Sequence, residues 1–211
     1  SENGKATDMP ALVKQLGFYF SDSNYPRDKF MRETAAQDPE GFIPCAVFLK
    51  FNKVKALTTK EEDVVSALSQ VENVELSEDK TKVKRIGVVP DEDVTLPRSI
   101  YVKGLPVDEE SPEVVQAEFE QHGKVLSVRI RRYPSTKKPK GSAFVEFATP
   151  EEAKAVVEKK PQYKGNETII MMKGDYVQMK KEELKAKSSK KRKAEDKDKE
   201  GEDGAEDKDK E

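Results

Sequence analysis

The sequence contains few of the residues that form disulfide bonds or bind structural metal ions. Its 211 residues include one cysteine, one histidine and no tryptophan. One cysteine cannot form an intrachain disulfide, and one cysteine with one histidine falls short of the four ligands of a structural zinc site. We therefore expect a reducing compartment, no metal and no cofactor. Cys45 lies in an apolar run, which favours a small buried hydrophobe over a nucleophile.

Long apolar runs are also missing. Hydrophobic residues make up 35% of the chain and charged residues 38%. No apolar run reaches the roughly 18 residues that a membrane span needs, and no signal peptide opens the sequence. We expect a soluble intracellular chain without membrane contact, and the excess of charge indicates that part of it is disordered.

The charges are unevenly placed, although the net charge is only −2. Residues 180–193 hold eight cations and two acids, whereas residues 194–211 hold four cations and ten acids. We expect residues 179–193 to form a basic extension rich in helix formers and residues 194–211 to be a disordered acidic tail. The basic cluster is typical of a nuclear-import signal or of phosphate contacts, and it consists of Lys190, Lys191, Arg192 and Lys193.

Aromatic residues, by contrast, are concentrated in residues 15–30, which contain five of them. Phe18, Tyr19 and Phe20 are consecutive, so at about 100° per residue no single helix face can bury all three. Phe20 fits the core of a small domain. At least one other ring should face solvent or a ligand, beside the charged run that includes Asp28, and such a surface suits stacking by nucleic-acid bases.

This stretch reads Q-L-G-F-Y-F-S-D-S-N-Y-P-R-D-K-F and resembles the signature of the La motif. Residues 41–44 and 48–52 resemble the second block of that motif, and the likeness runs over residues 8–87. It implies a winged helix, which agrees with the patterning. The patterning predicts a helix at 9–20, a second helix that Pro26 starts and that runs through 27–36, and a third at 46–51. A fourth helix should follow a capping box within 58–62, and a hairpin of strands 74–77 and 82–86 should form the wing.

Residues 88–97 contain two prolines and three acids with little apolar periodicity, so we expect a linker. A flexible tether of this length holds two domains at a high effective concentration. Two weak half-sites joined in this way can act as one.

From Ser99 onward the pattern is β-α-β-β-α-β and resembles an RNA-recognition motif, which we place at residues 98–178. It includes a strand at residues 125–132 and a helix that starts with Thr149 as its N-cap and Glu152 at its third position. Residues 140–147 match the motif K/R-G-F/Y-G/A-F-V-x-F/Y at seven of eight positions. Ser142 stands where a ring is usual, which leaves Tyr101 and Phe144 as the stacking platform. The fold class is therefore α+β. The sheet should bind RNA weakly, and a sheet used only for protein contacts is the alternative.

The La resemblance also implies roles for individual residues. Asp28 would accept hydrogen bonds from the 2′- and 3′-hydroxyls of a terminal ribose and repel a 3′-phosphate, although it could equally serve only the first turn of its helix. Gln15 would read a uracil edge, and Asn52 would add polar contacts. Val128 would lie on a strand whose edge closes over a uridine. The stacking residues would be Phe18, Tyr19, Phe30 and Phe51.

Together these features predict an RNA-binding protein and RNA chaperone, monomeric and nuclear. It would bind single-stranded oligouridylate 3′ ends with free hydroxyls on RNA polymerase III transcripts such as precursor tRNAs. It would thereby protect them from exonucleases and aid their folding and maturation. One RNA-recognition motif followed by a basic and then an acidic segment resembles the shorter, fungal type of La protein more than the longer animal type.

Two alternatives remain open: a La-related protein with another RNA target, and a winged-helix and RNA-recognition pair used mainly in ribonucleoprotein assembly. We do not expect an enzyme. No nucleophile and base pair is visible, and His122 lies at a helix-to-strand turn where we expect it to be exposed.

Overall fold

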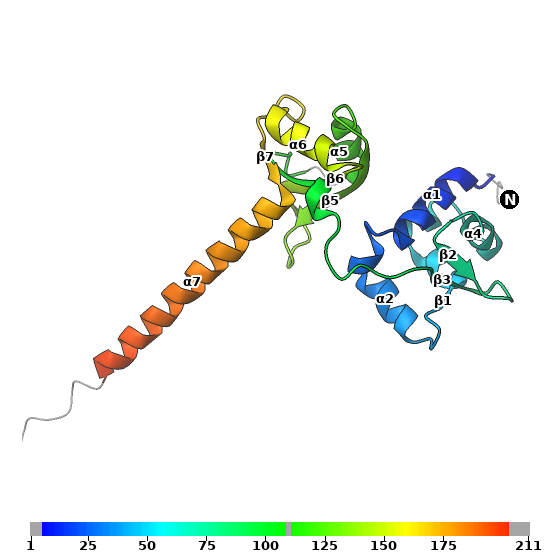
Figure 1. Cartoon of the computed structure of the whole chain (residues 1–211), viewed down its shortest axis with the longest axis horizontal. Coiled ribbons are helices and arrows are strands. Elements are labelled where there is room, and N and C mark those ends of the chain that lie inside the picture. Colours follow the sequence, from blue (N-terminus) through cyan, green and yellow to red (C-terminus); the bar gives the residue numbers. More distant parts are fainter. Residues whose placement is uncertain (1–5, 109–110, 203–211) are drawn as a thin grey trace, which may run out of the picture. The chain divides into compact units, whose positions relative to one another are not determined.

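The computed structural model describes the backbone of residues 6–108 and 111–202, and side chains as far as residue 189. The chain divides into two compact units, Ser1–Thr95 and Leu96–Glu211, and each is described by itself (Figure 1). No helix in the described ranges has the length and apolar character needed to cross a membrane.

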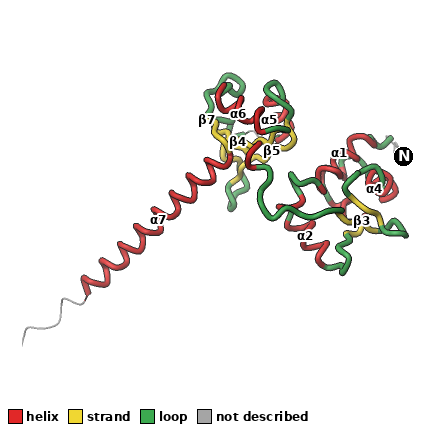
Figure 2. Tube along the Cα trace, in the orientation of Figure 1, coloured by secondary structure: helices red, strands yellow, loops and turns green. Residues whose placement is uncertain are grey.

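Unit 1 is a helical domain with one small sheet, as the colours of Figure 2 show. The antiparallel sheet has the order β1-β3-β2, and β2 and β3 form the expected hairpin. These elements agree with the expected winged helix. In chain order they are α1 (Met9–Phe20), η1 (Tyr25–Arg27), α2 (Lys29–Ala36), β1 (Ile43–Pro44), η2 (Cys45–Lys50), α3 (Asn52–Lys55), α4 (Glu61–Leu68), β2 (Val74–Leu76) and β3 (Lys82–Arg85).

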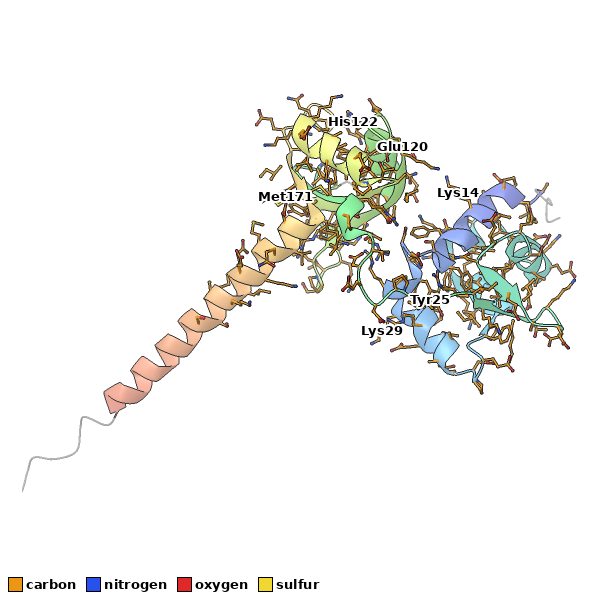
Figure 3. All side chains as sticks on the ribbon, in the orientation of Figure 1. Lys14, Tyr25, Lys29, Glu120, His122 and Met171 are labelled. Carbon is orange, nitrogen blue, oxygen red and sulfur yellow. The ribbon has the colours of Figure 1, made fainter. Side chains whose placement is uncertain are left out.

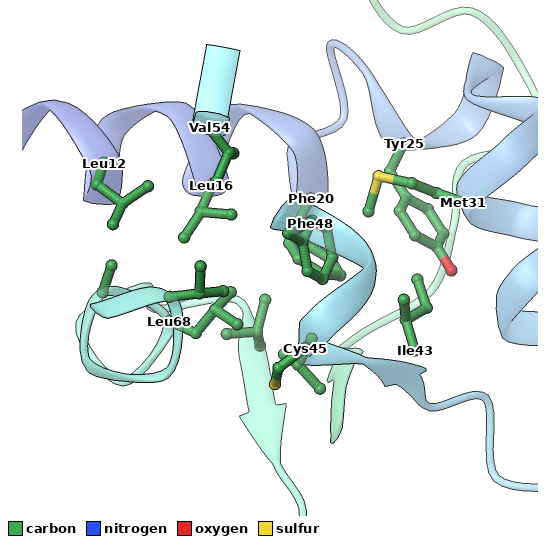
Figure 4. Packing of buried hydrophobic residues seen from close by; sticks show 14 of the residues in the cluster. Leu12, Leu16, Phe20, Tyr25, Met31, Ile43, Cys45, Phe48, Val54 and Leu68 are labelled. Atoms are coloured by element: carbon green, nitrogen blue, oxygen red, sulfur yellow. The ribbon is translucent and has the colours of Figure 1, made fainter. Parts of the chain in front are cut away.

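The core of unit 1 forms because apolar residues recur at helical spacing along α1. Leu12, Leu16 and Phe20 are completely buried, and Figure 4 shows them facing Phe48 of η2 and Leu68 of α4. Phe20 is therefore a core residue, as its spacing predicted. Cys45 lies in the same core, and burial raises the pKa of its thiol to about 11, which keeps it protonated at neutral pH.

Two expected helix starts in unit 1 differ from the structure. Pro26 does not begin the second helix but belongs to the 3₁₀ turn η1, and α2 begins after it with Asp28 as its N-cap. The capping box expected within residues 58–62 is absent from α4, whose N-cap is Lys60 without a side-chain bond. Thr58 instead donates a hydrogen bond to Asp63 at 2.6 Å, so its hydroxyl joins the loop to the helix.

Unit 2 has the predicted order of elements around a four-stranded antiparallel sheet, β5-β6-β4-β7. Alternation along β4 turns Ile100 and Val102 toward the core with α5 and α6, and Tyr101 toward the opposite face. The elements are η3 (Leu96–Arg98), β4 (Ser99–Lys103), α5 (Pro112–Phe119), β5 (Val125–Arg132), β6 (Pro139–Phe147), α6 (Pro150–Lys159), β7 (Ile169–Met172) and α7 (Lys173–Glu202).

Local signals in unit 2 were reliable where short-range chemistry decides the structure. Thr149 and Glu152 form the capping box that starts α6. Gly141 of the octapeptide has a φ of +68°, and a Cβ there would lie 2.9 Å from the carbonyl oxygen of Leu105. Only glycine fits such a position without strain.

The C-terminal segment differs from its prediction. Helix α7 begins at Lys173, inside the expected RNA-recognition motif, and continues to Glu202, so residues 194–202 are helical where we expected disorder (Figure 1). Alanine, lysine and glutamate are good helix formers, and the strongly charged sequence concealed that propensity. The rest of the expected acidic tail, residues 203–211, lies outside the described residues.

The segment expected as a free linker, residues 88–97, is divided between the two units. Asp93 and Thr95 contact Arg27 inside unit 1, whereas Leu96 already belongs to η3 of unit 2. The two prolines and the acidic residues suggested flexibility, but the ion pair with Arg27 is a long-range contact that composition could not reveal.

Candidate nucleic-acid interface

A partly exposed aromatic cluster lies where α1, α2 and the end of η2 meet. The ring of Tyr19 meets the ring of Phe51 edge-on, with centroids 4.9 Å apart, and the rings of Phe30 and Phe51 are 5.8 Å apart. Phe18 extends the cluster, 6.4 Å from Tyr19. Beneath it, the buried ring of Phe48 packs against Phe51 at 5.4 Å. Phe48 anchors the cluster in the core, and the partly exposed rings above it offer a stacking surface.

Phe30 is the most open ring of this aromatic cluster, with 52% of its surface exposed. It follows directly after Lys29, labelled in Figure 3, whose side chain is 84% exposed. A large apolar ring in water is unfavourable for folding, and the core does not require this one. The sequence signal was therefore sound in predicting that not all of these rings are buried.

Asp28 lies at the edge of the aromatic cluster, where it caps α2. Its Oδ1 accepts a hydrogen bond from the backbone N–H of Met31 at 3.0 Å, and its Oδ2 accepts one from Asn24 Nδ2 at 3.1 Å. A carboxylate can accept about four hydrogen bonds, so two of its acceptor positions remain after these contacts. The capping role and a ligand role are compatible.

Asn24 is a site residue that the sequence analysis missed. Its amide nitrogen donates both to Asp28 and to the backbone carbonyl of Tyr19, at 3.1 Å each. This one side chain therefore joins the end of α1 to the start of α2 and fixes the orientation of the carboxylate. Its position in the S-N-Y-P turn was the available signal, since asparagine side chains commonly bridge turns.

Gln15 and Tyr19 belong to the same group. They lie one helical turn apart on α1, and their side chains are hydrogen-bonded. Burial raises the pKa of the Tyr19 hydroxyl above its ordinary value, the bond to Gln15 opposes this, and the charge of Asp28 raises it further. Tyr19 therefore keeps its proton. Asn24, which bonds to both Tyr19 and Asp28, holds these two residues close together.

The sheet of unit 2 carries the second predicted stacking platform, formed by Tyr101 and Phe144. Helix α7 of the same unit covers this platform. The ring of Tyr176, in the first turn of α7, stacks on Tyr101 with centroids 3.9 Å apart and planes within 15°. It also meets Phe144 edge-on at 5.7 Å. Tyr101 is only 6% exposed as a result. This ring, predicted to stack on a base, is already stacked on a tyrosine of the same chain.

The position without a ring in the octapeptide has a structural explanation. The guanidinium of Arg131 on β5 lies 5.6 Å from the centroids of Tyr101 and Phe144 and 5.0 Å from that of Tyr176. Ser142 is buried beside it and accepts a long, 3.5 Å hydrogen bond from Arg131. A serine leaves room for the guanidinium, which forms cation–π contacts with all three rings.

The remaining predicted residues are dispersed. Asn52 is exposed at the first turn of α3. Val128 packs against the core of unit 2 from β5, which is an edge strand of the sheet. The structure does not describe the side chains of Lys190 to Lys193, although their backbone is part of α7.

A groove rich in cations runs between the sheet of unit 2 and α7. Such a concentration of positive charge favours phosphate groups. Its charged lining includes one acid, Glu183, which pairs with one of the lysines at 2.7 Å. The cations are Lys103, Arg131, Lys140, Lys180, Lys181 and Lys187.

His122 is not as open as its turn position suggested. It is partly buried, its ring lies edge-on to Phe119 at 6.5 Å, and its Nδ1 has no hydrogen-bond partner in the described part of the chain. Burial, with the nearby charge of Lys159, lowers its pKa below 6.5. Among the described residues, no three His, Cys, Asp or Glu side chains are grouped so as to hold a metal ion.

Comparison with known proteins agrees with this division into two domains. Residues 12–70 match the La domain, and residues 100–171 match the RNA recognition motif. The mouse Lupus La protein homolog is 37% identical over 199 residues, which cover 88% of this chain and 47% of that protein. Mouse La-related protein 7 is 35% identical over 150 residues, 70% of this chain and 26% of that protein.

Among solved structures, the La autoantigen N-terminal domain is 38% identical, with a TM-score of 0.38, over 39% of this chain and 90% of that one. The chain spans about half the length of the La protein homologue described above, and about a quarter of La-related protein 7.

A winged helix with an aromatic and carboxylate cluster, followed by a β-α-β-β-α-β sheet domain, defines a two-domain RNA-binding protein. The order of the two domains and the similarity to La protein homologues specify it further. The chain belongs to the La family.

Proposed function

We propose that this protein is an RNA chaperone that binds single-stranded 3′ ends terminating in oligouridylate with free hydroxyls. Its targets would be RNA polymerase III transcripts such as precursor tRNAs, which it would shield from exonucleases while they fold and mature. The observation that carries the proposal is the position of Asp28, joined to Tyr19 through Asn24, beside the partly exposed rings of Tyr19, Phe30 and Phe51.

The chemistry of the terminal ribose favours this assignment. A carboxylate held by Asn24 and by the N-terminus of α2 is already oriented, so gripping two adjacent hydroxyls requires little further ordering. The same charge opposes a 3′-phosphate. Nearby rings would stack on the last bases, each contributing about 1–3 kcal/mol, and the Gln15 amide offers both a donor and an acceptor to a uracil edge.

A titration of the full chain with labelled oligonucleotides tests the proposal. The set comprises oligouridylate with a 3′-hydroxyl, the same oligomer with a 3′-phosphate, and oligoadenylate with a 3′-hydroxyl. We expect the first to bind most tightly. Equal affinity for the two oligouridylates would contradict recognition of the free end, and tighter binding of oligoadenylate would favour a La-related protein with another target.

One observation favours a second candidate, a role mainly in ribonucleoprotein assembly. In unit 2, Tyr176 stacks on the predicted platform and leaves Tyr101 only 6% exposed, so this ring is not open to a base as it would be in an RNA reader. Failure of the full chain to bind any of the three oligomers would support this candidate.

We also propose a nuclear location, supported by the sequence of the basic cluster at residues 190–193. A fluorescent fusion of the full chain, compared with a version in which all four cations are glutamine, tests it. Nuclear accumulation that is lost in the substituted chain is the expected result. Unchanged accumulation would assign import to another segment.

A further inference from the structure

The segment that connects the two units is attached to unit 1 close to Asp28. Arg27, the last residue of η1, immediately precedes Asp28. Its Nη2 lies 3.0 Å from Asp93 Oδ1 and donates a hydrogen bond of 2.6 Å to Thr95 Oγ1. These contacts join residues 66 and 68 positions apart in the sequence.

The contact of Arg27 with the connecting segment is largely shielded from solvent and supported by further hydrogen bonds. Thr95 is only 1% exposed, and its backbone N–H donates to Asp93 Oδ1 at 3.1 Å, so threonine and aspartate form one local turn around the guanidinium. Hydrogen bonds in which both partners are charged are about twice as strong as neutral ones. The side chains of Arg27 and Asp93 are 27% and 29% exposed, which limits screening by solvent.

The C-terminal end of the connecting segment is held to unit 2 by an ion pair. Arg98, the last residue of η3, places Nη2 2.9 Å and Nε 3.0 Å from Glu146 Oε1 on β6. Glu146 is buried. Only Leu96 and Pro97 lie between the residue fixed to unit 1 and the residue fixed to unit 2, and proline restricts the backbone further.

We infer that Arg27 is a positioning residue that sets the attachment point of the second RNA-binding unit next to the end-binding site. Because Arg27 holds Thr95, the free connection between the units shortens from the ten residues 88–97 to two residues, Leu96 and Pro97, which we call the joint. When effective concentration falls as the −3/2 power of tether length, a connection about fivefold shorter raises it about tenfold. The expected gain in RNA affinity rests on the function proposed above. The shortening of the connection does not depend on that function.

The first test measures the joint without RNA. NMR relaxation of backbone amides in the full chain reports how fast each unit reorients. In Arg27→Gln, we expect the two units to reorient faster and more independently than in the wild type. Arg32→Gln is the matched control, because it removes one positive charge from the same region while its guanidinium bonds to the Pro26 carbonyl and not to the linker. Unchanged relaxation in Arg27→Gln, or an equal change in the control, would overturn the inference.

Thr95→Val tests the same contact from its other end and guards against a folding defect specific to Arg27. It should loosen the joint in the same direction, and the double variant should add little to Arg27→Gln, because both substitutions break one shared interaction. Fully additive effects would show that the two residues act separately and would contradict the shared clamp.

Oligouridylate affinity separates this inference from the proposed function. We expect Arg27→Gln to lose up to about tenfold in affinity for an oligomer long enough to contact both units, while Arg32→Gln loses less. If the joint loosens but no variant, nor the wild type, binds oligouridylate, the clamp stands and the proposed function fails. Lower affinity with unchanged relaxation would assign Arg27 a direct RNA contact and overturn its positioning role.

Discussion

The two units contain similar aromatic side chains in opposite states. In unit 1, Phe30 lies at the surface with 52% of its area exposed, beside a carboxylate with remaining acceptor capacity. In unit 2, Tyr101 is 6% exposed and stacked on Tyr176. The better-known RNA-binding signature thus belongs to the covered surface. A motif identifies which rings a fold places on one face, and the neighbouring elements decide whether a ligand can reach them.

The largest effect should follow from Asp28→Asn. Asparagine can still cap α2, but the charge that grips the terminal hydroxyls is lost. Charge-assisted hydrogen bonds contribute about 1.5–3 kcal/mol each, so with partial compensation by the amide we expect a loss of about 2 kcal/mol, roughly thirtyfold in affinity for 3′-hydroxyl oligouridylate. Fluorescence anisotropy measures both this loss and a reduced preference over the 3′-phosphate form.

Asp8→Asn provides the control for that substitution. Asp8 caps α1 by accepting a 3.1 Å hydrogen bond from the N–H of Ala11, so it has the same capping role in the same unit. Its substitution should leave RNA affinity unchanged. Equal losses in the two variants would mean that Asp28 acts only as a cap.

Phe30→Ala should have the next largest effect. Removing one stacking ring costs about 1–3 kcal/mol, and we expect roughly a tenfold loss of affinity with little change in the melting temperature, because the ring is half exposed. Ile86→Ala is a suitable control, since Ile86 is 49% exposed in the same unit and lies outside the aromatic cluster. A large stability loss in Phe30→Ala would indicate a structural role instead.

Tyr176→Ala should change affinity for a short oligouridylate by about twofold or less, because the covered platform takes no part in binding it. The same substitution removes a buried aromatic side chain and should destabilise unit 2 by about 3 kcal/mol. Thermal unfolding and anisotropy measured on the same variant separate these outcomes. An affinity loss as large as that of Phe30→Ala would show that the covered surface takes part in binding and would contradict the contrast.

The smallest effect concerns His122, in the covered unit. Its pKa is lowered in the folded state, so the unfolded chain binds a proton more readily and stability falls as the pH drops below about 6.5. Because it is the only histidine, NMR titration of its ring protons gives an unambiguous value. A measured pKa at or above 6.5 would contradict the burial of this ring.

Sequence patterns predicted the elements best where local chemistry decides them. The strand predicted at residues 125–132 matches β5 at both ends, and the capping box at Thr149 starts α6 as expected. Pro26 was misleading because proline suits the first turn of an α-helix and also a 3₁₀ turn. Helix α7 was suspected from its helix formers, but its stacking on Tyr101 depends on a tertiary contact.

In the candidate site too, features set by local spacing could be predicted, whereas features set by tertiary contacts could not. Spacing alone indicated that Phe18, Tyr19 and Phe20 could not share one buried face, and in the structure Phe20 is buried whereas the other two are partly exposed. The bridge formed by Asn24 and the guanidinium of Arg131 above Ser142 join residues whose partners are not evident from spacing. The roles of the predicted site residues in RNA binding stay predictions.

Chemical-shift mapping tests the central contrast most directly. The ¹⁵N-labelled full chain is titrated with oligouridylate carrying a 3′-hydroxyl, and amide shifts are followed in both units. The account predicts large shifts at Tyr19, Asp28 and Phe30 and little change at Tyr101 and Phe144. Large shifts at Tyr101 and Phe144 without shifts at Asp28 and Phe30 would contradict it, because the RNA would then have opened the covered surface and left the exposed one unused.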